Sequence, residues 1–189
     1  AAYLEWLTMS RNGVEERDTK NNHATCWNMQ AAAFARLTEN REVLKFVADR
    51  FRTILVPHQI EPDGRQPEEL RRTKPYGYCL FNLEAFTTLC RIVSEAGDDL
   101  WRFSTPDGRG VEKAIEFLYP YMRDKKSWPH APDVMYFQYW PMRQESLLFG
   151  GLAYGKPAYL DLWKTLPADS DVDEVIRNYF IRQPVLWVS

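Results

Sequence analysis

The sequence lacks three features, each of which would indicate a particular class of protein. It has no run of about 18 apolar residues, which excludes a membrane-spanning helix. Lys and Arg (24) do not outnumber Asp and Glu (26), so we expect no general nucleic-acid binding by a basic surface. Its three cysteines are odd in number and include no Cys-x-x-Cys pair, so neither a disulfide framework nor a structural zinc site is predicted.

The chain does contain a helical pattern of apolar residues along most of its 189 residues. The pattern predicts helices over 24–37, from 43 to an end or kink at Pro57, and over 83–97, 111–122, 141–154, 157–166 and 172–180. The polar run 11–22 is predicted to be a loop, and 128–140 an irregular segment. We therefore predict a single all-α domain over 1–189, built from stacked antiparallel helical hairpins.

Asn21-Asn22-His23 directly precedes the predicted helix over 24–37. Asn is a preferred N-cap residue, because its side-chain oxygen accepts a hydrogen bond from an unpaired backbone N–H of the first helical turn. A histidine in that turn can simply face solvent. The motif alone leaves two interpretations open, a helix cap and a functional site.

A second segment, 65–78, combines basic and aromatic residues before a strongly apolar helix. It contains Arg65, Arg71, Arg72, Lys74, Tyr76 and Tyr78. Charged runs usually face solvent, but helix N-termini and Arg side chains both favour anions, and Arg can hold a carboxylate with two parallel hydrogen bonds. The segment predicts an anion-binding site with a tyrosine nearby, and it does not select a reaction.

Three motifs taken together resemble the alginate lyase family, whose members have an α/α toroid fold. They are Asn21-Asn22-His23, the Arg-x6-Tyr spacing of Arg71 and Tyr78, and Phe81-Asn82-Leu83-Glu84. The resemblance implies an incomplete α/α toroid here, corresponding to the later part of the family's domain. It also implies cleavage of alginate or a related polyuronate by β-elimination.

The resemblance implies a catalytic role for four residues. Asn22 and Arg71 would neutralise the uronate carboxylate, so that negative charge developing at C5 can spread onto it. Tyr78 would protonate the leaving C4 oxygen and, for one substrate epimer, also remove the C5 proton. His23 would remove that proton for the other epimer or orient the site. No metal or other cofactor is implied, and the three histidines lack the i, i+4 spacing of a zinc site.

Further residues are expected to bind the sugar chain around these four. Trp27 is a candidate for stacking on a sugar ring, although relatives carry an aromatic residue one position earlier, where this chain has Cys26. Arg65, Arg72, Lys74 and Tyr76 are candidates for contacts with other sugar units; for the basic residues, solvated surface charge is an equally good interpretation.

The expected partner is a polyuronate polysaccharide or oligosaccharide, with no nucleic acid and no membrane. Because the motifs lie early in the chain, we expect self-association or a missing N-terminal half that completes the groove. By resemblance, the protein would be bacterial and periplasmic or secreted.

Two other functions remain open at this point. The chain could be a non-catalytic helical carbohydrate-binding or interaction module, or an inactive lyase fragment. More remotely, Cys26 could act as a nucleophile with His23, three residues earlier on one helical face, although a buried cysteine is the commoner outcome.

Overall fold

The computed structural model describes residues 2–188, and this part of the chain is helical, with no strand beyond an isolated bridge between Glu95 and Asp98. The α-helices are α1 (Ala2–Met9), α2 (Arg11–Arg17), α3 (Asn22–Leu37), α4 (Arg41–Arg50), α5 (Val56–Gln59), α6 (Pro67–Leu70), α7 (Pro75–Val93), α8 (Val111–Arg123), α9 (Glu145–Ala153), α10 (Pro157–Thr165) and α11 (Asp173–Arg177). A π-helical turn, η1 (Phe51–Leu55), follows α4, and the 3-10 turns are η2 (Leu100–Arg102), η3 (Lys125–Ser127), η4 (Phe137–Tyr139) and η5 (Pro184–Trp187).

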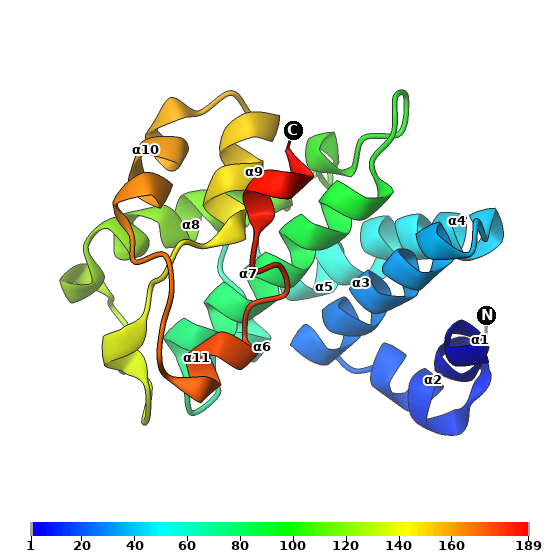
Figure 1. Cartoon of the computed structure of the whole chain (residues 1–189), viewed down its shortest axis with the longest axis horizontal. Coiled ribbons are helices and arrows are strands. Elements are labelled where there is room, and N and C mark those ends of the chain that lie inside the picture. The colour runs from blue at the N-terminus through cyan, green and yellow to red at the C-terminus, as the bar shows by residue number, and fades with distance from the viewer. Residues whose placement is uncertain (1, 189) are drawn as a thin grey trace.

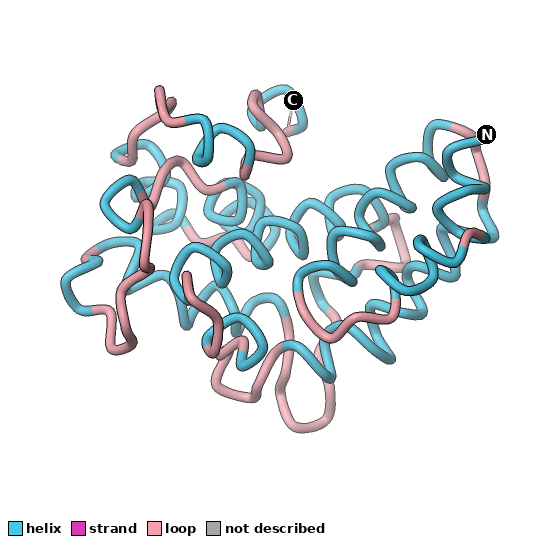
Figure 2. Tube along the Cα trace, turned by 90° about the horizontal axis from the view of Figure 1, so that it is seen from below, coloured by secondary structure: helices cyan, strands magenta, loops and turns pink. Residues whose placement is uncertain are grey.

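Neighbouring helices pack on one another along the molecule. Helix α1 packs on α2, α3 on α4 and α7, α7 on α9, and α9 on α10. The N-terminal helices lie at one end and α8 to α10 at the other (Figure 1), and the view from below places the N-terminus at the same end (Figure 2). The predicted all-α architecture of stacked helical hairpins is confirmed.

Helix α7 lies in the middle of this arrangement and is buried on nearly all sides. Its side chains belong to one continuous cluster of buried apolar residues, in which Phe86 packs edge-on against Phe51 of η1. A helix that is apolar all round is stable only when neighbours cover every face. Its N-terminal half therefore holds its side chains in fixed positions relative to α3 and α6.

The prediction of a loop over 11–22 is wrong for its first half, which forms α2. The Ser10 side chain caps this helix by accepting a hydrogen bond from the backbone N–H of Gly13 (3.0 Å). A Cβ at Gly13 would lie 2.1 Å from the carbonyl oxygen of Leu7. Glycine thus permits α1 and α2 to approach closely. Apolar periodicity cannot predict a contact that depends on a missing side chain.

Several predicted helix boundaries are also wrong, among them both ends of the helix predicted over 83–97, which is Pro75–Val93 in the structure. The helix does not end at Pro57 but continues to Gln59 through the π-helical turn η1, in which the backbone N–H of Val56 bonds to the carbonyl of Phe51, and through α5. The alternative, a kink at Pro57, stays a prediction. Helix α9 begins at Glu145 instead of Pro141, where the Glu84 carboxylate accepts the first N–H groups of the helix. Within 2–188, no helix has the length and apolarity needed to cross a bilayer.

Candidate functional site

The site is built around the N-terminus of α3, where the two asparagines have different tasks. Asn21 is the N-cap, and its side-chain oxygen accepts a hydrogen bond from the backbone N–H of His23 (3.2 Å). Asn22 is the first helical residue and is buried. The capping interpretation is therefore correct for Asn21, while Asn22 is free for a different contact.

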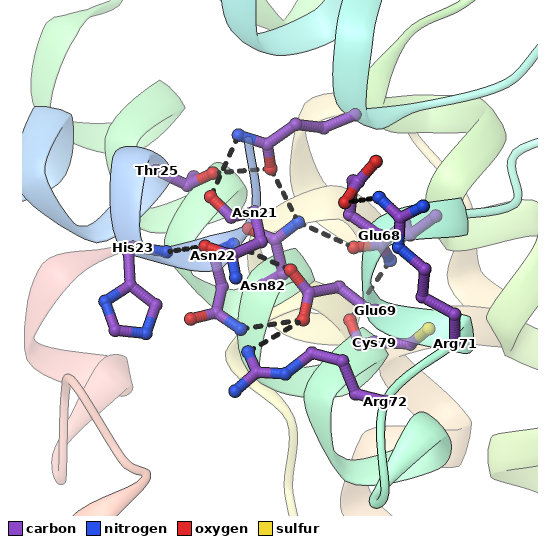
Figure 3. Close-up of polar contacts among 12 residues, drawn as sticks. Asn21, Asn22, His23, Thr25, Glu68, Glu69, Arg71, Arg72, Cys79 and Asn82 are labelled. Carbon is purple, nitrogen blue, oxygen red and sulfur yellow. Dashed lines mark hydrogen bonds and ion pairs between the residues drawn. The ribbon is translucent and has the colours of Figure 1, made fainter. Parts of the chain in front are cut away.

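Asn22 is held by Glu69, a buried acid on the single-turn helix α6. The backbone N–H of Asn22 donates to Glu69 Oε1 (2.6 Å), and its side-chain Nδ2 donates to Glu69 Oε2 (2.7 Å) (Figure 3). Burial raises the pKa of Glu69, and the hydrogen bonds from Asn22 together with the charge of Arg72 counteract that rise. The pair joins α3 to α6 across 47 residues of sequence.

Arg72 extends the site from Glu69 to Tyr78. Its Nη1 lies 3.5 Å from Glu69 Oε2, and its guanidinium carbon lies 3.7 Å from the ring centroid of Tyr78. The ion-pair distance is longer than an ordinary N–H···O hydrogen bond, and Nη1 has no hydrogen-bond partner among the described residues. Asn22, Glu69, Arg72 and Tyr78 therefore form one connected group, and the guanidinium retains hydrogen-bonding capacity.

Arg71, to which the resemblance assigned a role beside Asn22, does not join this group in the structure. Its side chain is 64% exposed and forms an ion pair with Glu68. Figure 3 shows the Arg71 guanidinium turned toward Glu68 and the Arg72 guanidinium turned toward the Asn22–Glu69 pair. Arg72, which the sequence analysis assigned to peripheral sugar binding, thus occupies the position expected of Arg71.

His23 is exposed next to Asn22, and Glu16 of α2 orients its ring. Its Nδ1 lies 2.6 Å from Glu16 Oε1. Because a carboxylate only accepts hydrogen bonds, Nδ1 carries a proton in this contact; in the neutral imidazole, Nε2 then carries the lone pair. Within the described residues no group contacts Nε2 by a hydrogen bond, so the base position of the ring is available.

Two predicted sugar-binding residues, Trp27 and Tyr76, are buried, and the structure does not bring them to the group. Trp27 is 1% exposed and donates its Nε1 hydrogen to the carbonyl of Leu7 (3.1 Å), which ties α3 to α1. Tyr76 is fully buried, and its hydroxyl donates to the carbonyl of Tyr121 (3.1 Å) while its ring packs edge-on against Trp128. Neither ring presents a face on which a sugar could stack.

The remaining predicted residues lie around the group and are paired with acids. The Lys74 ammonium is 5.3 Å from the ring centroid of Tyr78 and 2.7 Å from Glu174 of α11. Arg65 pairs with Asp63 (2.6 Å) on the exposed loop before α6. Lys74 is therefore adjacent to Tyr78, whereas no recorded contact joins Arg65 to the group.

A buried polar network supports the group from behind. Asn82, from the Phe-x-Leu-Glu motif, donates through Nδ2 to Gln59 Oε1 (3.0 Å) and to Gln66 Oε1 (2.9 Å). Thr25 donates to the same Gln59 oxygen, and Gln59 Nε2 donates to the backbone carbonyl of Asn21 (3.1 Å). Such a network favours the arrangement in which most of its donors and acceptors pair, although Asn82 Oδ1 has no hydrogen-bond partner among the described residues.

The Cys26 nucleophile is not supported by this environment. Burial raises the pKa of the Cys26 thiol to about 12, and the charges of Glu69 and Glu16 add to the effect. A thiol in such surroundings is an inert neutral group at physiological pH. No group of three or more His, Cys, Asp or Glu side chains in the described part of the chain could hold a metal ion.

Sequence reasoning missed two acids that organise the site, Glu16 and Glu69. Glu16 lies in the segment predicted to be a loop, so its position relative to His23 was not foreseeable. Glu69 precedes Arg72 by three residues, the spacing of a helical acid–base pair. That spacing could have indicated Glu69, although Glu68 and Arg71 have the same spacing.

Comparison with known proteins identifies the family. The family model described as alginate lyase matches residues 1–128. An alginate lyase structure from Bacteroides ovatus has 28% sequence identity and a TM-score of 0.78, with 95% of this chain and 48% of that chain covered. The structure "Alginate lyase A1-III H192A complexed with tetrasaccharide" has 18% identity and a TM-score of 0.59, with 80% and 47% covered, and supports the fold.

No curated protein matches the chain. The chain spans about half the length of the two solved structures that it resembles. The matched region includes the N-terminus of α3, α6 and Tyr78, and hence every residue of the group described above. The chain belongs to the alginate lyase family.

Proposed function

We propose that this chain carries the catalytic residues of a polysaccharide lyase that cleaves alginate or a related polyuronate by β-elimination. The observation that supports the proposal most is the placement of Arg72 between the Asn22–Glu69 pair and the ring of Tyr78. An amide donor, a guanidinium and a phenol thus meet at one place, with an imidazole on the residue next to Asn22.

In the proposed reaction, Asn22 and Arg72 bind the carboxylate of the uronate. The amide nitrogen of Asn22 has two hydrogens, of which the Glu69 bond uses one. Arg72 Nη1 has no hydrogen-bond partner within the described residues and only the long ion pair with Glu69. Both donors can therefore accommodate negative charge that moves from C5 into the carboxylate in the transition state.

His23 and Tyr78 move the protons. For one substrate epimer, His23 Nε2 takes the C5 proton, the C–H electrons form the C4=C5 double bond, and the C4–O bond breaks. The Tyr78 hydroxyl gives its proton to the departing oxygen, while the Arg72 cation next to the ring stabilises the charge that develops on the phenol. For the other epimer, Tyr78 would start as the phenolate, take the C5 proton and give that same proton to the departing C4 oxygen.

The test is the ultraviolet absorbance of the unsaturated uronate product. We expect it to rise when the chain is incubated with polymannuronate, polyguluronate or polyglucuronate, and the rate to fall about 10²–10⁴-fold in Tyr78→Phe. No product from any of the three polymers would contradict the proposal. Binding without product, unchanged in Tyr78→Phe and His23→Ala, would instead indicate a carbohydrate-binding module.

A further inference from the structure

Glu69 takes no part in the proton transfers, yet it is the most deeply buried acid of the site. Its side chain is 1% exposed, on a helix of four residues whose neighbouring acid Glu68 is 25% exposed. A buried carboxylate is costly unless hydrogen bonds and opposite charge compensate for lost hydration. Here the compensation comes from two residues, Asn22 and Arg72.

The carboxylate determines how the Asn22 amide is turned. A carboxylate can only accept, so the NH2 edge of the amide must face Glu69 and the opposite edge must face away. The second bond, from the backbone N–H of Asn22, satisfies a donor that the first turn of α3 would otherwise leave unpaired. Rotation of the amide would place its oxygen against a buried acid, and the arrangement is therefore fixed.

One oxygen of Glu69 also fixes the position of the Asn22 amide relative to the Arg72 guanidinium. Oε2 lies 2.7 Å from Asn22 Nδ2 and 3.5 Å from Arg72 Nη1. The two donors, which belong to segments 50 residues apart in the sequence, thus share a single anchor. The sulfur atoms of Cys26 and Cys79 are the other titratable groups that face this carboxylate, and burial keeps both thiols neutral.

We propose that Glu69 is a positioning residue, whose carboxylate holds the Asn22 amide and the Arg72 guanidinium at the separation and orientation that bind the uronate carboxylate. The proposal rests on the proposed function for the identity of the ligand. This role differs from a purely structural link between α3 and α6. It requires a negatively charged hydrogen-bond acceptor at position 69, and a side chain of the same size is not enough.

The first experiment does not depend on enzymatic activity. In protein labelled with 15N at asparagine, we expect the side-chain amide resonances of Asn22, assigned by their absence in Asn22→Asp, to shift with pH as Glu69 titrates. Because burial raises the pKa of Glu69, the midpoint should lie above 4.5. The shift should vanish in Glu69→Gln and persist in Glu68→Gln. An Asn22 amide that is insensitive to pH in the wild type would overturn the proposal.

The second experiment measures turnover. A misplaced binding group can cost up to about 100-fold in rate, so we expect Glu69→Gln to lower kcat/KM on the best polyuronate by about 10–100-fold. Its thermal unfolding should stay close to that of Glu68→Gln, the matched control that leaves kcat/KM unchanged. Wild-type kcat/KM in a folded Glu69→Gln protein would contradict the role.

The two proposals can fail separately. A wild-type chain without lyase activity would contradict the proposed function. The role of Glu69 would then be tested by measuring the affinity of the variants for a saturated mannuronate oligosaccharide. Weaker binding in Glu69→Gln than in Glu68→Gln would support the positioning role, and equal binding would contradict it.

Discussion

Arg71 and Arg72 are neighbours in the sequence, yet their guanidinium groups pair with different acids. Helix α6 ends at Leu70, and from there Arg71 reaches the partly exposed Glu68 while Arg72 reaches the buried Glu69. The composition of 65–78 predicted basic side chains near a tyrosine, and an arginine does lie against the ring of Tyr78. Which of two adjacent arginines does so depends on the direction in which the chain leaves a one-turn helix, and no spacing reports that direction.

Trp27 offers a test at the scale of a single residue, because its burial and its hydrogen bond to Leu7 indicate packing of α3 on α1. Trp27→Phe removes the hydrogen bond to the Leu7 carbonyl and leaves a small cavity between α1 and α3. We expect the free energy of unfolding to fall by about 1–3 kcal/mol, measured by urea denaturation, with KM for the polyuronate unchanged. Unchanged stability together with a raised KM would show that Trp27 contacts the substrate and would contradict this packing role.

Cys26 provides a second test at this scale. With a pKa of about 12, the thiol is almost entirely protonated at pH 8. We therefore expect a thiol-specific reagent to label it roughly 10³-fold more slowly than free cysteine, whose pKa is near 8.5. Denatured protein, in which all three cysteines react rapidly, is the control. Fast labelling of native Cys26, identified by mass spectrometry, would contradict the assigned environment.

At the scale of elements, the starts of α2 and α9 depend on contacts between helices. Periodicity predicted most helices because each has an apolar stripe that meets the core. It missed α2, whose packing on α1 depends on Gly13, and it placed the start of α9 four residues early. The true start is where Glu84 of α7 accepts the backbone N–H groups of Glu145 and Ser146, a contact across more than 60 residues.

This junction of α7 and α9 predicts how stability depends on pH. The carboxyl groups of Glu84 and Glu145 are buried and close together; burial raises the pKa of Glu84 to about 7 and, with the Glu84 charge, raises the pKa of Glu145. Tyr179 is the other titratable group that faces them. The folded state therefore holds more protons than the unfolded state, in which both groups titrate near 4.5. This stabilisation is fully present below about pH 4.5 and is lost as the pH rises through 7.

The variant Glu145→Gln removes one of the two acids while keeping an acceptor for the backbone N–H of Ile181. We expect its unfolding free energy at pH 8 to exceed that of the wild type by roughly 1–3 kcal/mol, with a flatter pH dependence between 5 and 8. The exposed Glu42→Gln is the control and should follow the wild type. A steep wild-type profile retained in Glu145→Gln would show that this pair does not titrate as described.

For the whole molecule, the sequence was sufficient for the fold class and the family, because the helical pattern and three short motifs lie within the region that the family model matches. It was not sufficient for the surroundings of the site, since Glu16 lies in a segment predicted to be a loop and Glu174 is 100 residues from Lys74 in the sequence. The expected self-association stays a prediction; Tyr3, Trp6 and Met9 of α1 are exposed apolar residues that could take part in it.

The most direct test of the account compares Arg72→Ala with Arg71→Ala on the same polyuronate. The two variants lose the same charge from adjacent positions, so surface electrostatics and composition are matched. We expect kcat/KM to fall about 10²–10³-fold in Arg72→Ala, and to stay within about 3-fold of the wild type in Arg71→Ala, since that side chain pairs with Glu68 outside the group. A large loss in Arg71→Ala with wild-type kcat/KM in Arg72→Ala would contradict the site as assembled around Asn22, Glu69 and Tyr78.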